Sequence, residues 1–387
     1  MVFRLTSEVK NYDWGKRSAI SNFLGHESNG TSEAEIWWGN HQMANCIIKT
    51  QDGDREFPGW LSETGLSFNF LVKLLAVGKT LSIQVHPDQA QAEEGFRVEN
   101  LSGVPLTEPS RKFRDASSKP ELLISLSKVF VGVAGFLSKN SFSERLRRWS
   151  EAGAPESLRL FLASAARDLP AAFYALKERD YSSREAEALA ELVIWLDQVS
   201  ETNFSDTTAK EIHLMRKVCT DHPRDPAALL VSTMHHIYLK RGEALFVPER
   251  EVHAYVEGFG LEIMLPSDNV SRIGLTSKHL SPDLFVSLAN FETRPGPQVL
   301  KGAELPSGKS YQPDEAEFMV LHLISQTQNV SPHSPAICLV ETGSVDVLED
   351  ASVSHLPAGT VAFLAPGASL TVSESGTSAW IIQSKSA

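Results

Sequence analysis

The stretch GEALFVPEREVH, residues 242–253, carries the pattern that decides the fold. A glycine opens the apolar run EALFV, which ends at Pro248 in a turn before a second strand-like run begins. Residues 359–369, GTVAFLAPGAS, repeat this order of glycine, apolar run, proline turn and new strand. Such an echo among many short strands indicates two related β-sandwiches within one chain.

The two copies differ at the residue that follows the turn. His253 has this place in the first copy, whereas Ser369 or Leu370 has it in the second. We therefore expect two jelly-roll sandwiches of the cupin type, of which only the first keeps the capacity to bind a metal ion.

The rest of the chain predicts a mainly β protein with an α-helical insertion. Residues 1–136 contain short apolar runs between turn-forming clusters, among them FLVKLLAV (70–77) and ELLISL (121–126). We expect a first sandwich built from residues 1–136 and 226–290, a helical domain at 137–225, and a C-terminal β domain at 291–387. Residues 290–315 are rich in proline, glycine and polar side chains, and we interpret them as a linker.

The clearest helix of the insertion is predicted within SSREAEALAELVIWLDQV, residues 182–199. Leu189, Leu192, Val193 and Leu196 recur at helical spacing and fall on one face. At its start, Ser182 and Glu185 fit a capping box.

The bulk composition is that of a soluble, acidic protein. The chain has 387 residues, of which 42% are hydrophobic, and a net charge of −12. An acidic surface argues against nucleic acid or an anionic membrane as a partner, and an anionic substrate would need a local basic pocket. The three cysteines, Cys46, Cys219 and Cys338, are scattered and predict reduced thiols. With no signal-peptide or membrane-spanning stretch, we expect a cytoplasmic monomer.

A polar pair in the apolar stretch LSIQVHPD, residues 81–88, is the first sign of a site. On a strand, Gln84 and His86 point to the same face because successive side chains alternate. Together with Glu121 and His253 they offer two imidazoles, one carboxylate and one amide oxygen. This mixture suits a divalent first-row metal, above all zinc, and without cysteine it favours a catalytic rather than a structural site.

Each candidate ligand also has a purely structural interpretation. A Gln-x-His pair more often forms internal hydrogen bonds than a metal site, the carboxylate could pair with Lys119, and the last histidine could be a satisfied core residue. His235 and His236 are adjacent, so on a strand they face opposite ways and are not expected to chelate as neighbours.

A second polar cluster, SDNVSRIGLTSKH, occupies residues 267–279. Asp268 and Arg272 are four residues apart and lie on the same side of either a strand or a helix. Because the cluster directly follows the apolar LEIML, it indicates a segment at the rim of a site, with a solvated turn as the alternative.

Taken in order, these motifs resemble the type I phosphomannose isomerases. LSIQVHPD, the KPE of SSKPELL, GEALFVPEREVHAYV and SDNVSRIGLTSKH carry the resemblance, and NYDWGKR, AEIWWGNH and FLVKLLA support it. It covers about residues 5–290 and continues more weakly to the C-terminus. It implies a zinc-dependent enzyme that interconverts mannose 6-phosphate and fructose 6-phosphate through a cis-enediol. It also implies a catalytic cupin domain, a helical domain and a second cupin-like domain.

The resemblance assigns roles to single residues. Its metal ligands fall on Gln84, His86, Glu121 and His253, which would hold one zinc ion per chain. Its substrate-binding positions fall on Trp14 and Lys73, and its catalytic positions fall on Lys119, Glu262, Asp268 and Arg272. Arg272 is the expected second electrophile. The general base stays open between Glu262 and Asp268, the latter acting through the ring of His86.

Several positions depart from the family pattern. After Ile263-Met264 the chain has Leu265-Pro266, where the family commonly has small residues. Ser117 and Ser118 stand where the family usually has Asn-His, and Leu137 replaces an arginine. These changes leave the metal ligands intact and bear on sugar specificity and turnover.

Two rival interpretations belong to other classes. One is another cupin metalloenzyme, either an iron-dependent oxygenase or an isomerase of a different sugar phosphate, although Gln84 as a fourth ligand would fill a position that oxygen chemistry needs. The other is a catalytically idle sugar-binding cupin, which the Ser117–Ser118 pair favours and the retained Asp268 and Arg272 oppose.

Overall fold

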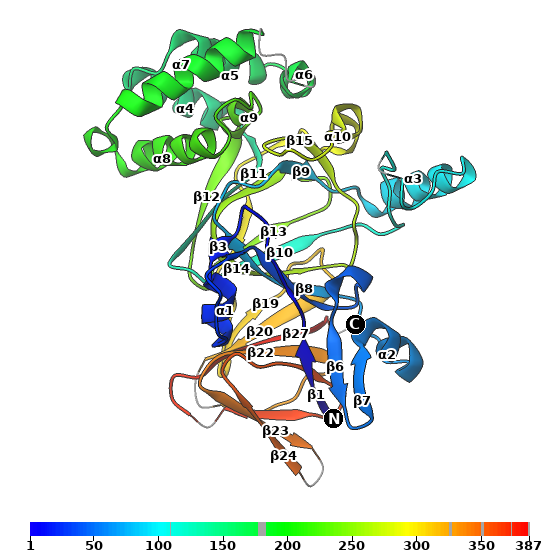
Figure 1. Ribbon diagram of the computed structural model, residues 1–387. Coiled ribbons are helices and arrows are strands. Elements are labelled where there is room, and N and C mark those ends of the chain that lie inside the picture. Colours follow the sequence, from blue (N-terminus) through cyan, green and yellow to red (C-terminus); the bar gives the residue numbers. More distant parts are fainter. Residues whose placement is uncertain (109, 177–182, 325–326, 350–351, 373, 386–387) are drawn as a thin grey trace.

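Two large, mostly antiparallel sheets and a helical lobe make up the computed structural model of the chain (Figure 1). The structure describes residues 1–108, 110–176, 183–324, 327–349, 352–372 and 374–385. Strands account for 35% of it and helices for 28%, so the fold is mixed rather than mainly β. Within the described residues, every helix is too short or too polar to cross a lipid bilayer.

The larger sheet holds the strands that build the candidate site. Its strands are β2 (Val9–Lys10), β5 (Glu35–Gly39), β8 (Leu71–Val77), β9 (Ile83–Val85), β10 (Glu121–Ser125), β11 (Val129–Leu137), β12 (Met234–Lys240), β13 (Ala244–Val247), β14 (His253–Met264), β15 (Ser271–Gly274), β16 (Thr293–Arg294) and β17 (Gln298–Leu300). The main path runs β17-β13-β10-β14-β8-β5-β2, and the other strands pair alongside β14, β11 and β9. β8 and β10 are buried along their whole length, as their continuous apolar runs predict.

The second sheet combines strands from both ends of the chain. They are β1 (Val2–Thr6), β6 (Ile47–Thr50), β7 (Gly53–Glu56), β18 (Ala303–Leu305), β19 (Gly308–Tyr311), β20 (Phe318–Leu323), β22 (Ala336–Thr342), β25 (Val361–Leu364) and β27 (Ser378–Ser384). β1 pairs with β25 through Val2 and Leu364, and it passes to β6 through Leu5 and Ile48. The N-terminal strand is therefore built into the sheet of the C-terminal β unit.

Two smaller sheets complete the described strands. One contains β21 (Thr327–Val330), β23 (Ser344–Glu349), β24 (Ser352–Pro357) and β26 (Ser369–Val372), and the other pairs β3 (Lys16–Arg17) with β4 (Ser32–Glu33). The sequence echo corresponds to β13–β14 and to β25–β26, two strands joined through a proline turn in each case. Gly242 and Gly359, which open the two copies, both have positive φ, at 77° and 80°.

The prediction of a linker at residues 290–315 was wrong. This segment contains four short strands, β16 to β19, of which β16 and β17 join the larger sheet and β18 and β19 the second. The backbone groups of these strands pair with the edges of the two large sheets. This pairing orders a segment whose polar composition is typical of a linker.

The two β units share a hydrophobic core. A single cluster of buried side chains includes Phe70, directly before β8, and Phe318 of β20, whose ring centroids are 5.7 Å apart. Cys46, Cys219 and Cys338 are free and buried, in agreement with the predicted reduced thiols.

The helical lobe lies at the opposite end of the structure from the C-terminal strands (Figure 1). The described helices are α1 (Ala19–Leu24), α2 (Phe57–Thr64), α3 (Gln89–Leu101), α4 (Lys139–Glu151), α5 (Glu156–Ala165), α6 (Leu169–Ala175), α7 (Arg184–Gln198), α8 (Asp206–Asp221), α9 (Ala228–Val231), α10 (Pro282–Leu288) and the 3-10 turns η1 (Gln42–Ala44) and η2 (Glu201–Asn203). α4 to α9 form the lobe.

Helix α7 confirms the apolar face predicted for residues 182–199. Leu189, Leu192 and Leu196 are buried, and Val193 packs against the same cluster. Ser182 of the predicted capping box lies outside the described residues, and the observed N-cap is Ser183, whose hydroxyl accepts the N–H of Ala186.

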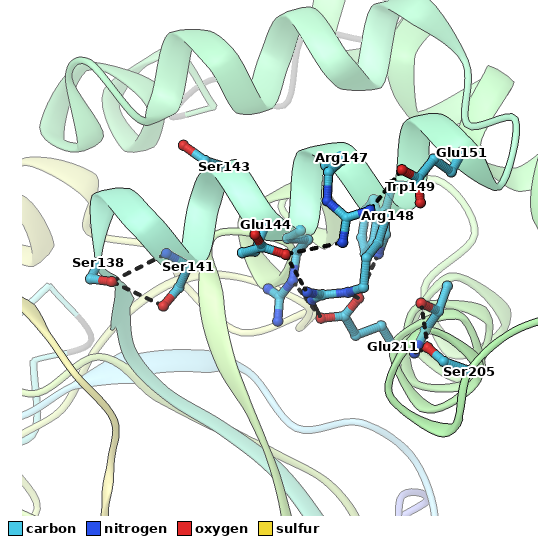
Figure 2. Close-up of polar contacts among 12 residues, drawn as sticks. Ser138, Ser141, Ser143, Glu144, Arg147, Arg148, Trp149, Glu151, Ser205 and Glu211 are labelled. Atoms are coloured by element: carbon cyan, nitrogen blue, oxygen red, sulfur yellow. Dashed lines mark hydrogen bonds and ion pairs between the residues drawn. The ribbon is translucent and has the colours of Figure 1, made fainter.

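A buried carboxylate ties the helices of the lobe together (Figure 2). Glu211 of α8 lies 3.1 Å from Arg145 Nε of α4 and accepts a 2.9 Å hydrogen bond from the indole of Trp149. Arg148 adds a second ion pair to the same carboxylate. Arg145 also donates to the carbonyls of Ser232 and Met234, so this network fixes the lobe to the start of β12.

A Glu211→Ala variant is expected to lose about 3 kcal/mol of stability, because it leaves two arginines without their buried partner. Urea unfolding followed by tryptophan fluorescence measures the change, since Trp149 lies within the network. Arg147→Ala is the matched control on the same helix. Its ion pairs with Glu144 and Glu151 are solvent-exposed, so it should cost less than about 1 kcal/mol. Equal effects of the two variants would contradict a structural role for the buried network.

Candidate metal centre

Strand register gathers the polar side chains into two rows across the larger sheet. Trp37 of β5 pairs with Lys73 of β8, which pairs with Glu262 of β14. In the other row, Gln84 of β9 pairs with His253 of β14 on one side and with Arg272 of β15 on the other. Because directly paired residues share a face of the sheet, each row presents its side chains together.

Three of the predicted ligands converge on one point. His86 Nε2 lies 3.2 Å from Glu121 Oε1, and His253 Nε2 lies 3.3 Å from Glu121 Oε2. All three residues are buried, and their ligand atoms lie within 4.8 Å of one another. They come from β10, β14 and the end of β9, three strands distant in sequence.

The hydrogen bonds of both imidazoles leave Nε2 available for a metal. His86 Nδ1 lies 2.7 Å from the carbonyl oxygen of Asn269, and His253 Nδ1 lies 3.0 Å from that of Glu251. A carbonyl only accepts, so each Nδ1 carries the proton and each Nε2 has a lone pair. Such backbone partners typically orient histidine ligands of metal ions.

The donor set therefore fits a divalent cation. Two Nε2 lone pairs face an anionic carboxylate, which is repulsive unless a positive charge lies among them. The buried Nε2 of His86 has no hydrogen-bond partner among the described residues, and burial lowers the pKa of His86 to about 4, which keeps its ring neutral. The Gln84 amide nitrogen lies 3.1 Å from His253 Nε2, so an amide turned by 180° would bring its oxygen to the same point.

Charged groups surround the three ligands on the inner face. Lys119 Nζ lies 2.9 Å from Glu121 Oε1, and Lys73 Nζ lies 3.5 Å from Glu262 Oε2. Burial, followed by the charge of Glu121, raises the pKa of Glu262 to about 7. Burial opposes the charged form of Lys73, but Glu262 and the other nearby carboxylates outweigh it and raise its pKa. The site thus holds two lysines in an otherwise acidic protein.

The remaining predicted residues lie around this centre at different depths. Asp268 is 43% exposed and lines a cleft of about 1360 Å³, and the proximity of His41 lowers its pKa. Arg272 is half-buried next to Gln84 in register. Trp14 is half-buried, packs against the apolar cluster of Leu75 and Leu123, and its ring lies 5.9 Å from Tyr12.

The positions that depart from the family pattern have structural partners. The carbonyl of Ser117 accepts hydrogen bonds from Ser267 and Asn269, and the N–H of Ser118 donates to Gln89. The loop before Lys119 is thereby joined to the loop that carries Asp268. Leu137 is buried in the cluster shared with the helical lobe and has no polar role.

His235 and His236 do not take part, as the sequence predicted. The Nε2 atom of His235 bonds to the carbonyl of Arg294, and that of His236 to the carbonyl of Val231.

Sequence reasoning missed several side chains at the site. Trp37 lies between two lysines, with Lys10 Nζ 4.4 Å and Lys73 Nζ 4.3 Å from its ring centroid. Tyr255 donates to Glu121 Oε2 at 3.2 Å, and His41 contacts Asp268. The alternation of Glu35 and Trp37 along AEIWWGNH was the available signal, because a charged and an aromatic residue share a face of a buried strand there.

The fold and this centre define a mixed protein of strands and helices with a buried candidate site for a divalent metal ion. Residues 2–138 match the family model described as the phosphomannose isomerase type I catalytic domain. Over these residues the chain is similar to the type I phosphomannose isomerases.

Relatives extend the similarity over almost the whole chain. The mannose-6-phosphate isomerase of Escherichia coli K12 is 28% identical over 389 residues, which cover 94% of each protein. Mannose-6-phosphate isomerase 1 of Arabidopsis thaliana is 28% identical, with 93% of this chain and 88% of the relative covered. A crystal structure of the Salmonella typhimurium enzyme bound to fructose 6-phosphate and zinc has the same fold, with a TM-score of 0.85, 24% identity and complete coverage of both chains.

Proposed function

We propose that this chain is a zinc-dependent mannose-6-phosphate isomerase. The observation that carries the proposal is the buried His86–Glu121–His253 cluster, with two lysines and a carboxylate of raised pKa beside it. Relatives that span the chain bear this name, and the similar Salmonella structure holds fructose 6-phosphate and zinc. The substrate class that follows is a small sugar phosphate.

The metal would be held by His86, Glu121 and His253, with Gln84 as the fourth ligand and one zinc ion per chain. When bound, zinc polarises oxygens of a sugar and stabilises negative charge on them. The ligand set contains one carboxylate and no thiolate, so most of the ion's positive charge is left for this task.

Proton transfer between C1 and C2 needs a base close to the sugar and an electrophile for the developing oxyanion. Glu262 supports the first role, because burial has moved its pKa close to neutrality. Asp268 stays as the alternative base, but the predicted relay through the ring of His86 was wrong, because His86 Nδ1 contacts the carbonyl oxygen of Asn269 instead. Arg272 is proposed as the second electrophile, since a guanidinium remains charged when it is half-buried.

The lysines and the aromatic residue complete the proposed assignment. Lys119 touches the metal-binding carboxylate and is placed to meet a sugar hydroxyl during ring opening. Lys73 and Trp14 are proposed to bind substrate, and the two lysines supply the local positive charge that a phosphorylated sugar requires.

The finer architecture also belongs to this proposal. We propose two cupin-type jelly rolls, with the catalytic one at residues 1–136 and 226–290, the helical domain at 137–225 and the metal-free one at 291–387. We propose further that the protein works as a cytoplasmic monomer without nucleic acid or membrane partners.

A coupled assay with metal analysis tests the function. Fructose 6-phosphate formed from mannose 6-phosphate, with one zinc per chain, is the expected result. Oxygen consumption with bound iron would favour the oxygenase, conversion of another sugar phosphate would favour a different isomerase, and stoichiometric zinc without turnover would favour an idle sugar-binding protein.

The pH dependence of kcat/KM tests Glu262 as the base. Burial, Glu121 and Glu35 raise the pKa of Glu262 to about 7, although Lys73 and Lys119 oppose them. A base must be deprotonated, so activity should rise with pH through an acid limb. A bound cation offsets the charge of Glu121, so the limb should lie below about 7.

Glu262→Gln should remove this limb and lower kcat at least about 100-fold, the lower end for a positioned base. The measurement is the rate in saturating zinc between pH 5 and about 9, with zinc content checked at each point. A wild-type acid limb retained in the variant would assign the base to another residue.

A further inference from the structure

The segment after β5 brings a histidine to the wall of the cleft. Gly39 ends β5 with a φ of 131°, and a Cβ there would lie 2.2 Å from the carbonyl oxygen of Phe70. Only glycine allows this close turn. The turn places His41 with its ring edge against Trp37, at a centroid distance of 5.5 Å, and leaves it 8% exposed.

The tautomer of His41 follows from its partner in η1. The backbone N–H of Met43 donates to His41 Nδ1 over 3.1 Å, so this nitrogen is the acceptor and the proton resides on Nε2. Nε2 lies 3.3 Å from Asp268 Oδ1. The ring nitrogen that carries the proton therefore lies next to this carboxylate oxygen.

The backbone of Asp268 is fixed from the other side. Its N–H donates to Asp115 Oδ2 over 2.8 Å, and Ser267 donates to the other oxygen of the same carboxylate at the same distance. Within the described part of the chain, the structure gives the Asp268 carboxylate one polar side-chain contact, with His41. Both residues line the cleft of about 1360 Å³.

We propose that His41 is a positioning residue of the reaction, which acts through Asp268. Its Nε2 contacts Oδ1 and holds the carboxylate in place at the cleft that both residues line, where it would meet a sugar hydroxyl. His41 itself need not touch the substrate. This inference rests on the proposed isomerase function and adds a residue that none of the sequence motifs assigned to the site.

Two substitutions separate this role from that of a helix cap. In His41→Asn, the amide oxygen replaces Nδ1 as the acceptor for Met43, but nothing reaches Asp268. In His41→Gln, the amide nitrogen replaces Nε2 as the donor to Asp268, while the cap is lost. If His41 only caps η1, His41→Asn should be more active than His41→Gln. If His41 positions Asp268, His41→Gln should be the more active variant.

The expected result is a decrease in kcat of about tenfold or more for His41→Asn, because a hydrogen bond to a charged group is lost. KM should change by less than about threefold, and His41→Gln should keep kcat within about threefold of the wild type. Zinc content should equal that of the wild type in both variants. In an Asp268→Asn background, His41→Asn should change kcat less than about twofold, since the two residues act as a unit.

A wild-type kcat in His41→Asn, or a His41→Gln variant as slow as His41→Asn with full zinc, would overturn the inference and leave the proposed function standing. Additive effects of His41→Asn and Asp268→Asn would overturn it as well. A wild-type protein without isomerase activity would instead refute the proposed function, and this inference with it.

Discussion

A Glu121→Gln variant is expected to lose its bound metal and its isomerase activity together. The substitution preserves the shape of the side chain but removes the negative charge that lies between His86 Nε2 and His253 Nε2. It also leaves Lys119 without its carboxylate, so a buried positive charge then opposes the metal. Loss of a residue that only orients a ligand costs about 10- to 100-fold in metal affinity, and loss of the ligand itself should exceed that.

Zinc per chain after dialysis and the rate of the coupled assay measure the two losses. Glu341→Gln is the matched control, because Glu341 is also a buried carboxylate paired with an arginine, Arg241, but lies in the C-terminal sheet. It should lower stability and leave zinc content unchanged. Stoichiometric zinc and normal turnover in Glu121→Gln would remove this carboxylate from the proposed centre.

An Arg272→Ala variant is expected to keep its zinc while kcat falls at least about 100-fold. Arg272 pairs in register with Gln84, next to the ligands, but its guanidinium has no ion-pair partner among the described residues. Burial lowers its pKa, although not enough to discharge a guanidinium at neutral pH. A half-buried cation without a protein counter-charge is suited to an anionic substrate or to charge that develops in the transition state.

Steady-state kinetics and the zinc content per chain test this role of Arg272. Arg97→Ala serves as the control, because Arg97 is exposed on α3 and forms a surface ion pair with Glu94. A large rise in KM with kcat unchanged would assign Arg272 to substrate binding rather than to the chemical step.

The sequence alone predicted individual strands and helices of this structure. Continuous apolar runs predicted β8 and β10, and apolar spacing predicted the buried face of α7. Both signals depend on residues that are neighbours along the chain, where periodicity is informative. The ligand types at Gln84, His86, Glu121 and His253 could also be read directly, but their convergence could be inferred only from the ordered resemblance to a family.

The rest depends on which strands pair and in which register. Trp37, Lys73 and Glu262 form a row only because β5, β8 and β14 align residue for residue. A shift of one residue would turn each of these side chains to the other face. The contact of His41 could not be predicted for a similar reason, because its partner Asp268 lies on a loop that is distant in the sequence. The four strands at residues 293–311 likewise form because they pair with strands of the two large sheets.

The position of β1 in the second sheet affects how the protein folds during synthesis. Residues 2–4 leave the ribosome long before residues 362–364, with which they pair. Until residues 362–364 have been made, that edge must stay unpaired or be covered temporarily, and a chaperone could bind there. Removing β25 would therefore expose the edge of β1 that it covers.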